Sequence, residues 1–99
     1  MNFSLLTETD ASKNLAERHK QLRLLRKWKR TTLADRSGVP VSSIIRFEQT
    51  AQISLKNLLM LFSAMGRLQE IETLLLPPEA TSIDDLEKQG SKIIKRGSR

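Results

Sequence analysis

The sequence predicts an all-α protein of five short helices, and three features of its 99 residues support this fold class. Apolar residues recur at spacings of three and four positions, which is the period of a helix with one buried face. Glycine and proline stand between the apolar segments, where they end helices. Strand signals are weak, since the chain has no Tyr and few β-branched runs that alternate with polar residues.

The first helix is predicted to follow an N-terminal arm, which we assign to residues 1–10. Asp10 or Ser12 is expected to cap it, because a short side-chain oxygen accepts from the free amides of the first turn. The helix should reach about Lys27, with Trp28 in the core where the chain turns. Its buried face is expected to consist of Leu15, His19, Leu22 and Leu25.

A second helix at about residues 30–37 and a third at about residues 41–49 are separated by Gly38 and Pro40. Glycine favours the positive φ at which many helices end, and proline suits the first turn of the next helix. At 100° per residue, the third helix divides into an inner side with Ile44 and Phe47 and an outer side with Val41, Ser42, Ile45 and Arg46.

Two further helices complete a domain that we assign to residues 11–78. Ser54 should cap the fourth helix and Gly66 should end it. Its apolar stripe is expected to consist of Leu55, Leu58, Leu59, Phe62 and Met65. The fifth helix, at about residues 68–76, is expected to bury Leu68, Ile71, Leu74 and Leu75. Residues 79–99 form a charged tail that we expect to be flexible on its own.

Basic residues are concentrated in one part of the chain, whose formal net charge is +6. Residues 18–30 contain no acid and seven basic residues, which are Arg18, Lys20, Arg23, Arg26, Lys27, Lys29 and Arg30. Such a region suits a polyanion, either nucleic acid or an acidic lipid surface. Taken alone, a charge run of this kind is more often a solvated helix face.

The composition disfavours an enzyme. The chain has no Cys, which excludes disulfides, a thiol nucleophile and a Cys-based metal site. His19 is the single histidine and lacks partners for catalysis or metal binding, so we interpret it as a packing residue. Asp84, Asp85 and Glu87 lie in the predicted tail and are interpreted as solvating charge. No catalytic residue, metal or cofactor is therefore expected.

The segment at residues 32–48 carries most of the functional information and reads TLADRSGVPVSSIIRFE. It combines a short helix, a glycine turn and a second helix with a small, polar outer face, as a helix-turn-helix requires. Its pattern of Leu-Ala-x-x-Ser-Gly-Val, then Ser-x-Ile-x-Arg-apolar-Glu, resembles the Xre/Cro family of phage-type repressors. The resemblance covers about residues 15–76 and implies a five-helix, lambda-repressor-like fold that binds double-stranded operator DNA.

The resemblance also implies roles for individual residues. Base contacts are expected from Val41, Ser42, Ile45 and Arg46, although Ile45 has a protein contact as its alternative. For Arg46 the alternative is a surface ion pair with Glu48 or Asp35. Phosphate contacts are expected from Lys29, Arg30, Ser43 and Thr50, and a structural ion pair from Arg23 and Glu48. Because Lys29 stands where the family usually has Thr or Ser, the second helix should lack a side-chain cap.

Further segments, at residues 6–10, 54–58, 65–68, 74–77 and 89–92, resemble HipB-type antitoxins. In that subgroup a dimeric repressor also binds and restrains a HipA-like kinase. The expected function is thus a transcriptional repressor that is the antitoxin of a HipA-like kinase system and regulates its own operon. A free-standing phage-type or metabolic Xre-family regulator is the alternative, and a protein-interaction module with a vestigial DNA face is the third.

A homodimer is expected, because twofold symmetry matches a palindromic site. Ile71, Leu74 and Leu75 are the candidate dimer seam, with a purely intramolecular core as the alternative. No apolar run is long enough to span a bilayer, and residues 1–7 do not resemble a signal peptide. The expected location is the bacterial cytoplasm, with the protein on the nucleoid when bound and no membrane partner.

Overall fold

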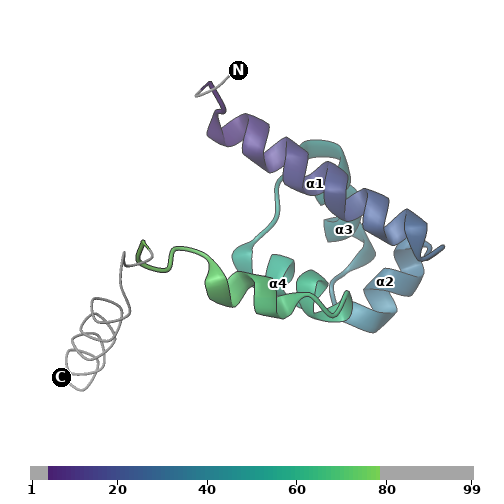
Figure 1. Cartoon of the computed structure of the whole chain (residues 1–99). Coiled ribbons are helices and arrows are strands. Elements are labelled where there is room, and N and C mark those ends of the chain that lie inside the picture. The colour runs from purple at the N-terminus through teal and green to yellow at the C-terminus, as the bar shows by residue number, and fades with distance from the viewer. Residues whose placement is uncertain (1–4, 79–99) are drawn as a thin grey trace.

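The computed structural model describes residues 5–78, and this part of the chain is helical without a strand. Its elements are the α-helices α1 (Glu8–Leu25), α2 (Arg30–Ser37), α3 (Val41–Thr50) and α4 (Leu55–Ala64), followed by the 3₁₀ helix η1 (Leu68–Thr73) (Figure 1). The prediction of an all-α protein with five helices is therefore confirmed for these residues. The predictions for residues 79–99 lie outside the described residues.

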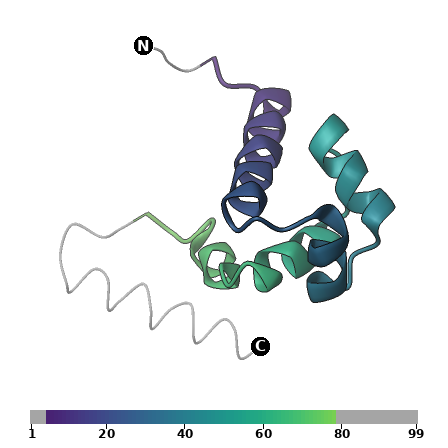
Figure 2. The same ribbon diagram turned by 90° about the vertical axis from the view of Figure 1, so that its right-hand side faces the viewer.

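The helices form one compact packing unit. α2 packs against both α3 and α4, α1 packs against α3, and η1 packs against α4. The fully or nearly fully buried apolar side chains are Ala16, Leu33, Val39, Ile44, Phe47, Leu61 and Met65. In Figure 2, α3 lies on one side of α1 and the chain that follows η1 lies on the other. None of the described helices combines the length and the apolar character needed to cross a membrane.

α1 begins earlier and ends earlier than the sequence predicts. Thr7 is its cap: the Thr7 hydroxyl accepts from the Asp10 amide at 3.0 Å, and the Asp10 carboxylate accepts from the Thr7 amide at 3.4 Å. This reciprocal capping box replaces the expected cap at Asp10 or Ser12 and moves residues 8–10 from the arm into the helix. At the other end, Lys27 has a φ of 59°, which a helix cannot continue through.

The connection between α2 and α3 follows the prediction closely. Gly38 ends α2 with a φ of 82°, and its amide donates to the Ala34 carbonyl at 2.8 Å. Val39 is buried against the core, and Pro40 precedes the first residue of α3. The three-residue turn thus fixes where α3 begins and which of its faces meets the core. α3 runs one residue further than expected, to Thr50, and is capped by Ala51, which has a φ of 62°.

Several leucines that were predicted to be buried are exposed. Leu25, on α1, is 76% exposed, and Leu55, on α4, is 68% exposed. The predicted fifth α-helix is a shorter 3₁₀ helix that ends at Thr73. Leu74 and Leu75 follow it with 61% and 101% exposure, so the expectation that this helix buries them is wrong. Helical spacing shows which residues share a face, but it does not show whether another element covers that face.

Candidate nucleic-acid interface

α3 presents a small and polar outer face. Ser42 and Arg46 are exposed on this face, and Val41 and Ile45 are partly buried beside them. The opposite face packs into the core through Ile44 and Phe47, which are 0% and 2% exposed. α3 is therefore anchored along one side, and its four predicted base-contacting residues remain accessible on the other.

Two shallow hollows lie along this outer face and share Ser43 and Arg46. One hollow extends along α3 to Gln49 and Thr50. The other reaches the start of α4, where it is lined by Gln52, Ile53, Ser54 and Asn57. The Ser54 hydroxyl accepts from the Asn57 amide at 3.1 Å, which is the predicted cap of α4. The residues around Gln52 and Asn57 were not predicted to belong to the site.

Arg46 is held by a neutral partner. Its Nη2 donates to Gln52 Oε1 at 2.5 Å, and neither Glu48 nor Asp35 forms the ion pair that was weighed for it. The positive charge of the guanidinium therefore has no carboxylate against it within the described residues. No sequence rule points to Gln52, because the two residues are six positions apart and are joined by a turn through Ala51.

Thr50 uses its hydroxyl within the protein. The hydroxyl donates to the Arg46 carbonyl at 2.7 Å and accepts from the Gln52 amide at 3.3 Å. A threonine hydroxyl has one hydrogen to donate, and a phosphate oxygen only accepts. In the structure the Thr50 hydroxyl stabilises the loop that carries Gln52. The phosphate contact expected of Thr50 stays a prediction.

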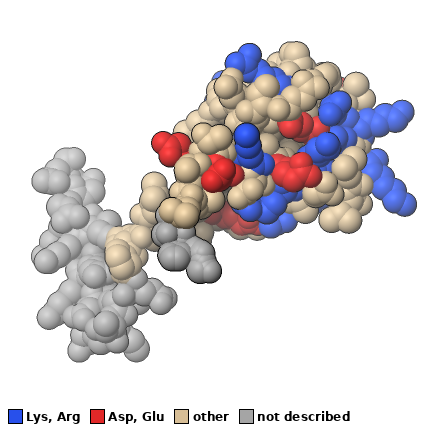
Figure 3. All heavy atoms as spheres, turned by 90° about the horizontal axis from the view of Figure 1, so that it is seen from above, with Lys and Arg blue, Asp and Glu red and all other residues tan. Residues whose placement is uncertain are grey.

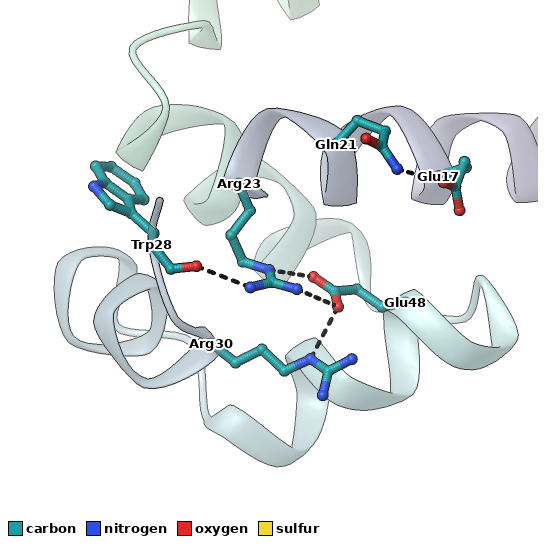
Figure 4. A network of polar contacts seen from close by, with 6 residues as sticks. All are labelled: Glu17, Gln21, Arg23, Trp28, Arg30 and Glu48. Atoms are coloured by element: carbon teal, nitrogen blue, oxygen red, sulfur yellow. Dashed lines mark hydrogen bonds and ion pairs between the residues drawn. The ribbon is translucent and has the colours of Figure 1, made fainter. Parts of the chain in front are cut away.

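A buried ion network fixes α3 relative to α1 and α2 (Figure 4). Arg23 donates two hydrogen bonds to the Glu48 carboxylate. Arg23 Nε donates to Glu48 Oε2 at 2.7 Å, and Arg23 Nη2 donates to Glu48 Oε1 at 3.1 Å. Its Nη1 donates to the Trp28 carbonyl at 2.9 Å. The Arg23 and Glu48 side chains are only 8% and 1% exposed. The pair that the sequence predicts from these two residues is present, with a third bond that ties in the connection between α1 and α2.

Arg30 joins the same network. Its Nε donates to Glu48 Oε1 at 2.9 Å, and its side chain is 37% exposed. Burial alone would raise the pKa of Glu48, but the hydrogen bonds from Arg23 and then Arg30 outweigh burial and lower this pKa. Glu48 is therefore ionised at neutral pH, and it faces two cations. Arg30, predicted as a phosphate contact, is first of all a partner of Glu48, with part of its guanidinium at the surface.

The other two predicted phosphate residues lie at the starts of helices. Lys29 is exposed at the cap position of α2, which has no side-chain cap, as the sequence predicts. Ser43 is partly buried in the first turn of α3 and lines both hollows. Amides in the first turn of a helix attract anions. Figure 3 shows Lys and Arg side chains at the outermost right-hand end of the molecule.

The basic run separates into structural and solvent-facing residues. Arg26 Nη2 donates to the Met65 carbonyl at 2.7 Å, and its guanidinium lies 5.1 Å from the centre of the Trp28 ring. Arg36 also lies over this ring, at 4.7 Å, so the half-buried Trp28 is covered by cations as well as by the core. Arg26 therefore contributes to the fold as Arg23 does, but it is exposed and no carboxylate pairs with it among the described residues.

His19 is buried, and the part of the chain that the structure describes gives it no partner for metal chemistry. Its ring is edge-on to Phe47, with the centroids 5.6 Å apart, and the residue is 4% exposed. Burial lowers its pKa first; Arg23 lowers it further, while Glu48 raises it. The described residues contain no group of three or more His, Asp or Glu side chains that could hold a metal ion.

Comparison with known proteins adds no relative. The chain matches no protein-family model, and no curated protein matches its sequence. The residues of the interface are therefore interpreted from their own geometry and from the motif that they form.

Proposed function

We propose that this chain is a sequence-specific DNA-binding repressor of the Xre/Cro type, in which α2 and α3 form a helix-turn-helix. The observation that carries the proposal is the pairing of Arg46 with Gln52 on a small outer face of α3 that is backed by a buried inner face. An α-helix with its side chains is about 10–12 Å across, so α3 fits a major groove about 12 Å wide. Its 10 residues extend about 15 Å along the helix axis.

The outer face supplies the base contacts in this proposal. Arg46 would bind a guanine through two hydrogen bonds, because a guanidinium matches the O6 and N7 acceptors of that base. Ser42 can contact several bases, and Val41 or Ile45 can meet a thymine methyl. The phosphates beside the groove would be bound by Lys29, the exposed part of Arg30 and the first turn of α3 at Ser43.

The proposed repressor acts as a homodimer on a palindromic operator. One α3 offers few base contacts, and a second copy doubles them at a spacing of about one helical turn of DNA, 34–36 Å. Ile71, Leu74 and Leu75 remain the proposed seam, since Leu74 and Leu75 are exposed and apolar in the single chain.

An antitoxin of a HipA-like kinase is the second proposed role. It is favoured by the neighbouring apolar residues Leu5 and Leu6, which precede α1, are 84% and 68% exposed, and lie outside the outer face of α3, so that they are available to a protein partner. The deciding experiment is co-purification with the product of the adjacent reading frame. Recovery of a kinase-like protein supports the antitoxin; recovery of nothing favours a free-standing regulator.

Sequence-specific binding is tested by comparing the affinity of the protein for operator DNA with its affinity for random DNA. The operator is first identified by binding the purified protein to genomic DNA fragments and sequencing those that it retains. Arg46→Ala should lower the preference for the operator by about 5- to 150-fold, which corresponds to the discrimination of one bidentate base contact. Lys13→Ala, which removes an exposed charge from α1 outside both the outer face of α3 and the groove between α1 and α4, is the matched control and should leave the preference unchanged. If Arg46→Ala weakens binding to both DNAs equally, the role given to Arg46 is wrong.

A further inference from the structure

An apolar groove lies between α1 and the end of α4. It has a volume of about 340 Å³, and its apolar lining comes from Leu15 and Leu22 on α1 and from Phe62 and Met65 at the end of α4. The rim is polar, with Gln21 hydrogen-bonded to Glu17 on one side and the Arg67–Glu70 ion pair on the other. An apolar floor inside a polar rim is the anatomy of a protein–protein interface.

The floor of the groove also contains two buried nitrogen atoms without hydrogen-bond partners among the described residues. His19 contributes to the lining and is 4% exposed, and neither of its ring nitrogens has a hydrogen-bond partner among the described residues. Its lowered pKa keeps the ring neutral, so one nitrogen donates and the other accepts. A peptide segment, which brings backbone N–H and C=O groups with its apolar side chains, suits this floor better than a purely aliphatic ligand.

The chain itself provides an apolar peptide that no other described residue covers. Leu74, Leu75 and Leu76 follow η1 with exposures of 61%, 101% and 62%. Leu75 has a φ of 61°, in the left-handed region that non-glycine residues rarely adopt. Full exposure means that the Leu75 side chain is not packed against any other described residue. The segment carries no charge and matches the groove in chemistry, and it begins right after the helix whose Glu70 belongs to the rim.

We propose that two copies of this chain associate reciprocally, with Leu75 and Leu76 of each copy seated in the α1–α4 groove of the other. A groove and a matching segment on one surface are self-complementary, and such surfaces close into a twofold dimer. None of the groove's lining residues comes from α2 or α3, so the outer face of α3 stays free in both copies. The proposal rests on the dimer of the proposed function and names the surface that forms it.

Disulfide cross-linking tests the reciprocal seating, because the chain has no cysteine of its own. The double variant Gln21→Cys/Leu75→Cys places one thiol on the rim and one on the segment. Oxidation should yield a covalent dimer on a non-reducing gel. The matched control Gln21→Cys/Leu55→Cys, which uses another exposed leucine, should remain monomeric. A monomer band with no free thiol would show that the segment enters its own groove, and the absence of any cross-link would equally overturn the proposal.

Sedimentation equilibrium gives a second readout. Leu75→Asp should weaken dimerisation by about 100-fold or more, since each dimer buries two copies of this leucine and each is worth about tenfold. The monomer should still fold, because the Leu75 side chain is fully exposed in the part of the chain that the structure describes, and an unchanged helical circular dichroism spectrum verifies this. Leu55→Asp should leave dimerisation unchanged. A wild-type chain that is monomeric at its highest soluble concentration, or an unaffected Leu75→Asp dimer, refutes the seating.

Both measurements are made without DNA, so they are independent of the proposed function. A chain that binds its operator but fails to cross-link or dimerise refutes only the reciprocal groove. A chain that dimerises as described but shows no preference for any DNA refutes only the repressor.

Discussion

Replacing Glu48 with glutamine tests whether the buried ion network holds α3 in place. The Glu48 carboxylate accepts two hydrogen bonds from Arg23 and one from Arg30, and its side chain is 1% exposed. Glu48→Gln keeps the shape of the side chain but removes the charge. It therefore leaves the guanidinium of Arg23, which is 8% exposed, buried without an anion.

The cost follows from the burial of Arg23. Removing one partner of a buried ion pair typically destabilises a protein by about 3–5 kcal/mol. Since Arg30 is partly solvated, we expect the lower end of this range, about 3 kcal/mol. Domains of this size have a free energy of unfolding of about 5–15 kcal/mol, so the variant should fold but be much less stable. Glu70→Gln is the matched control, because Glu70 forms a solvent-exposed pair with Arg67 and its replacement should leave the stability nearly unchanged.

The same variant should change the pH dependence of stability. The pKa of Glu48 is lowered from its ordinary value of 4.5 in the folded chain. A carboxyl with a lowered folded pKa contributes stability that is fully present above 4.5 and is lost as the pH falls through the folded pKa. The wild type should therefore lose stability below pH 4.5 more steeply than Glu48→Gln, and the difference between the two should shrink in acid.

Urea denaturation at a series of pH values, followed by circular dichroism and by the fluorescence of the single Trp28, measures both effects. Trp28 is a suitable probe because its carbonyl accepts from Arg23. If Glu48→Gln is as stable as the wild type at pH 7, or if their difference does not depend on pH below 4.5, the network does not anchor α3.

Three further variants test the interface and the turn. Gln52→Ala should reduce the preference for operator over random DNA by about 3- to 10-fold without changing the salt dependence, because it frees Arg46 without removing a charge; unchanged preference in an anisotropy titration would contradict this. Arg30→Ala should weaken binding to both DNAs and lower the salt slope by about 1, and should also lower the urea midpoint, since Arg30 binds Glu48; a change of operator preference alone would be inconsistent with a phosphate contact. Gly38→Ala should destabilise the fold by about 1–2 kcal/mol, because the glycine has a φ of 82° and a new Cβ would lie 3.2 Å from Met60 Cε; thermal unfolding at the wild-type temperature would refute the strain.

The elements of this protein could be predicted from its sequence because their signals are local. The cap at Ser54, the glycine that ends α2 and the two faces of α3 all depend on residues within a few positions of one another. The order of the helices and the start of α3 after Pro40 followed from such signals. The local prediction failed at α1, where Thr7 and Asp10 form a capping box that was not recognised. It also failed at η1, which is a 3₁₀ helix that ends at Thr73 and not an α-helix to residue 76.

Only the tertiary structure decided which side chains remain free to act. The resemblance implied the Arg23–Glu48 pair, but only the packed helices show that Arg30 also binds Glu48, across 18 positions of sequence, and that Arg26 donates to the Met65 carbonyl. The hydrogen bond from Arg46 to Gln52 forms because the turn after α3 brings the two side chains together. Leu75 is exposed because no other described element packs against it. Periodicity gives each helix a face, whereas the partner of that face is set by elements far away in the chain.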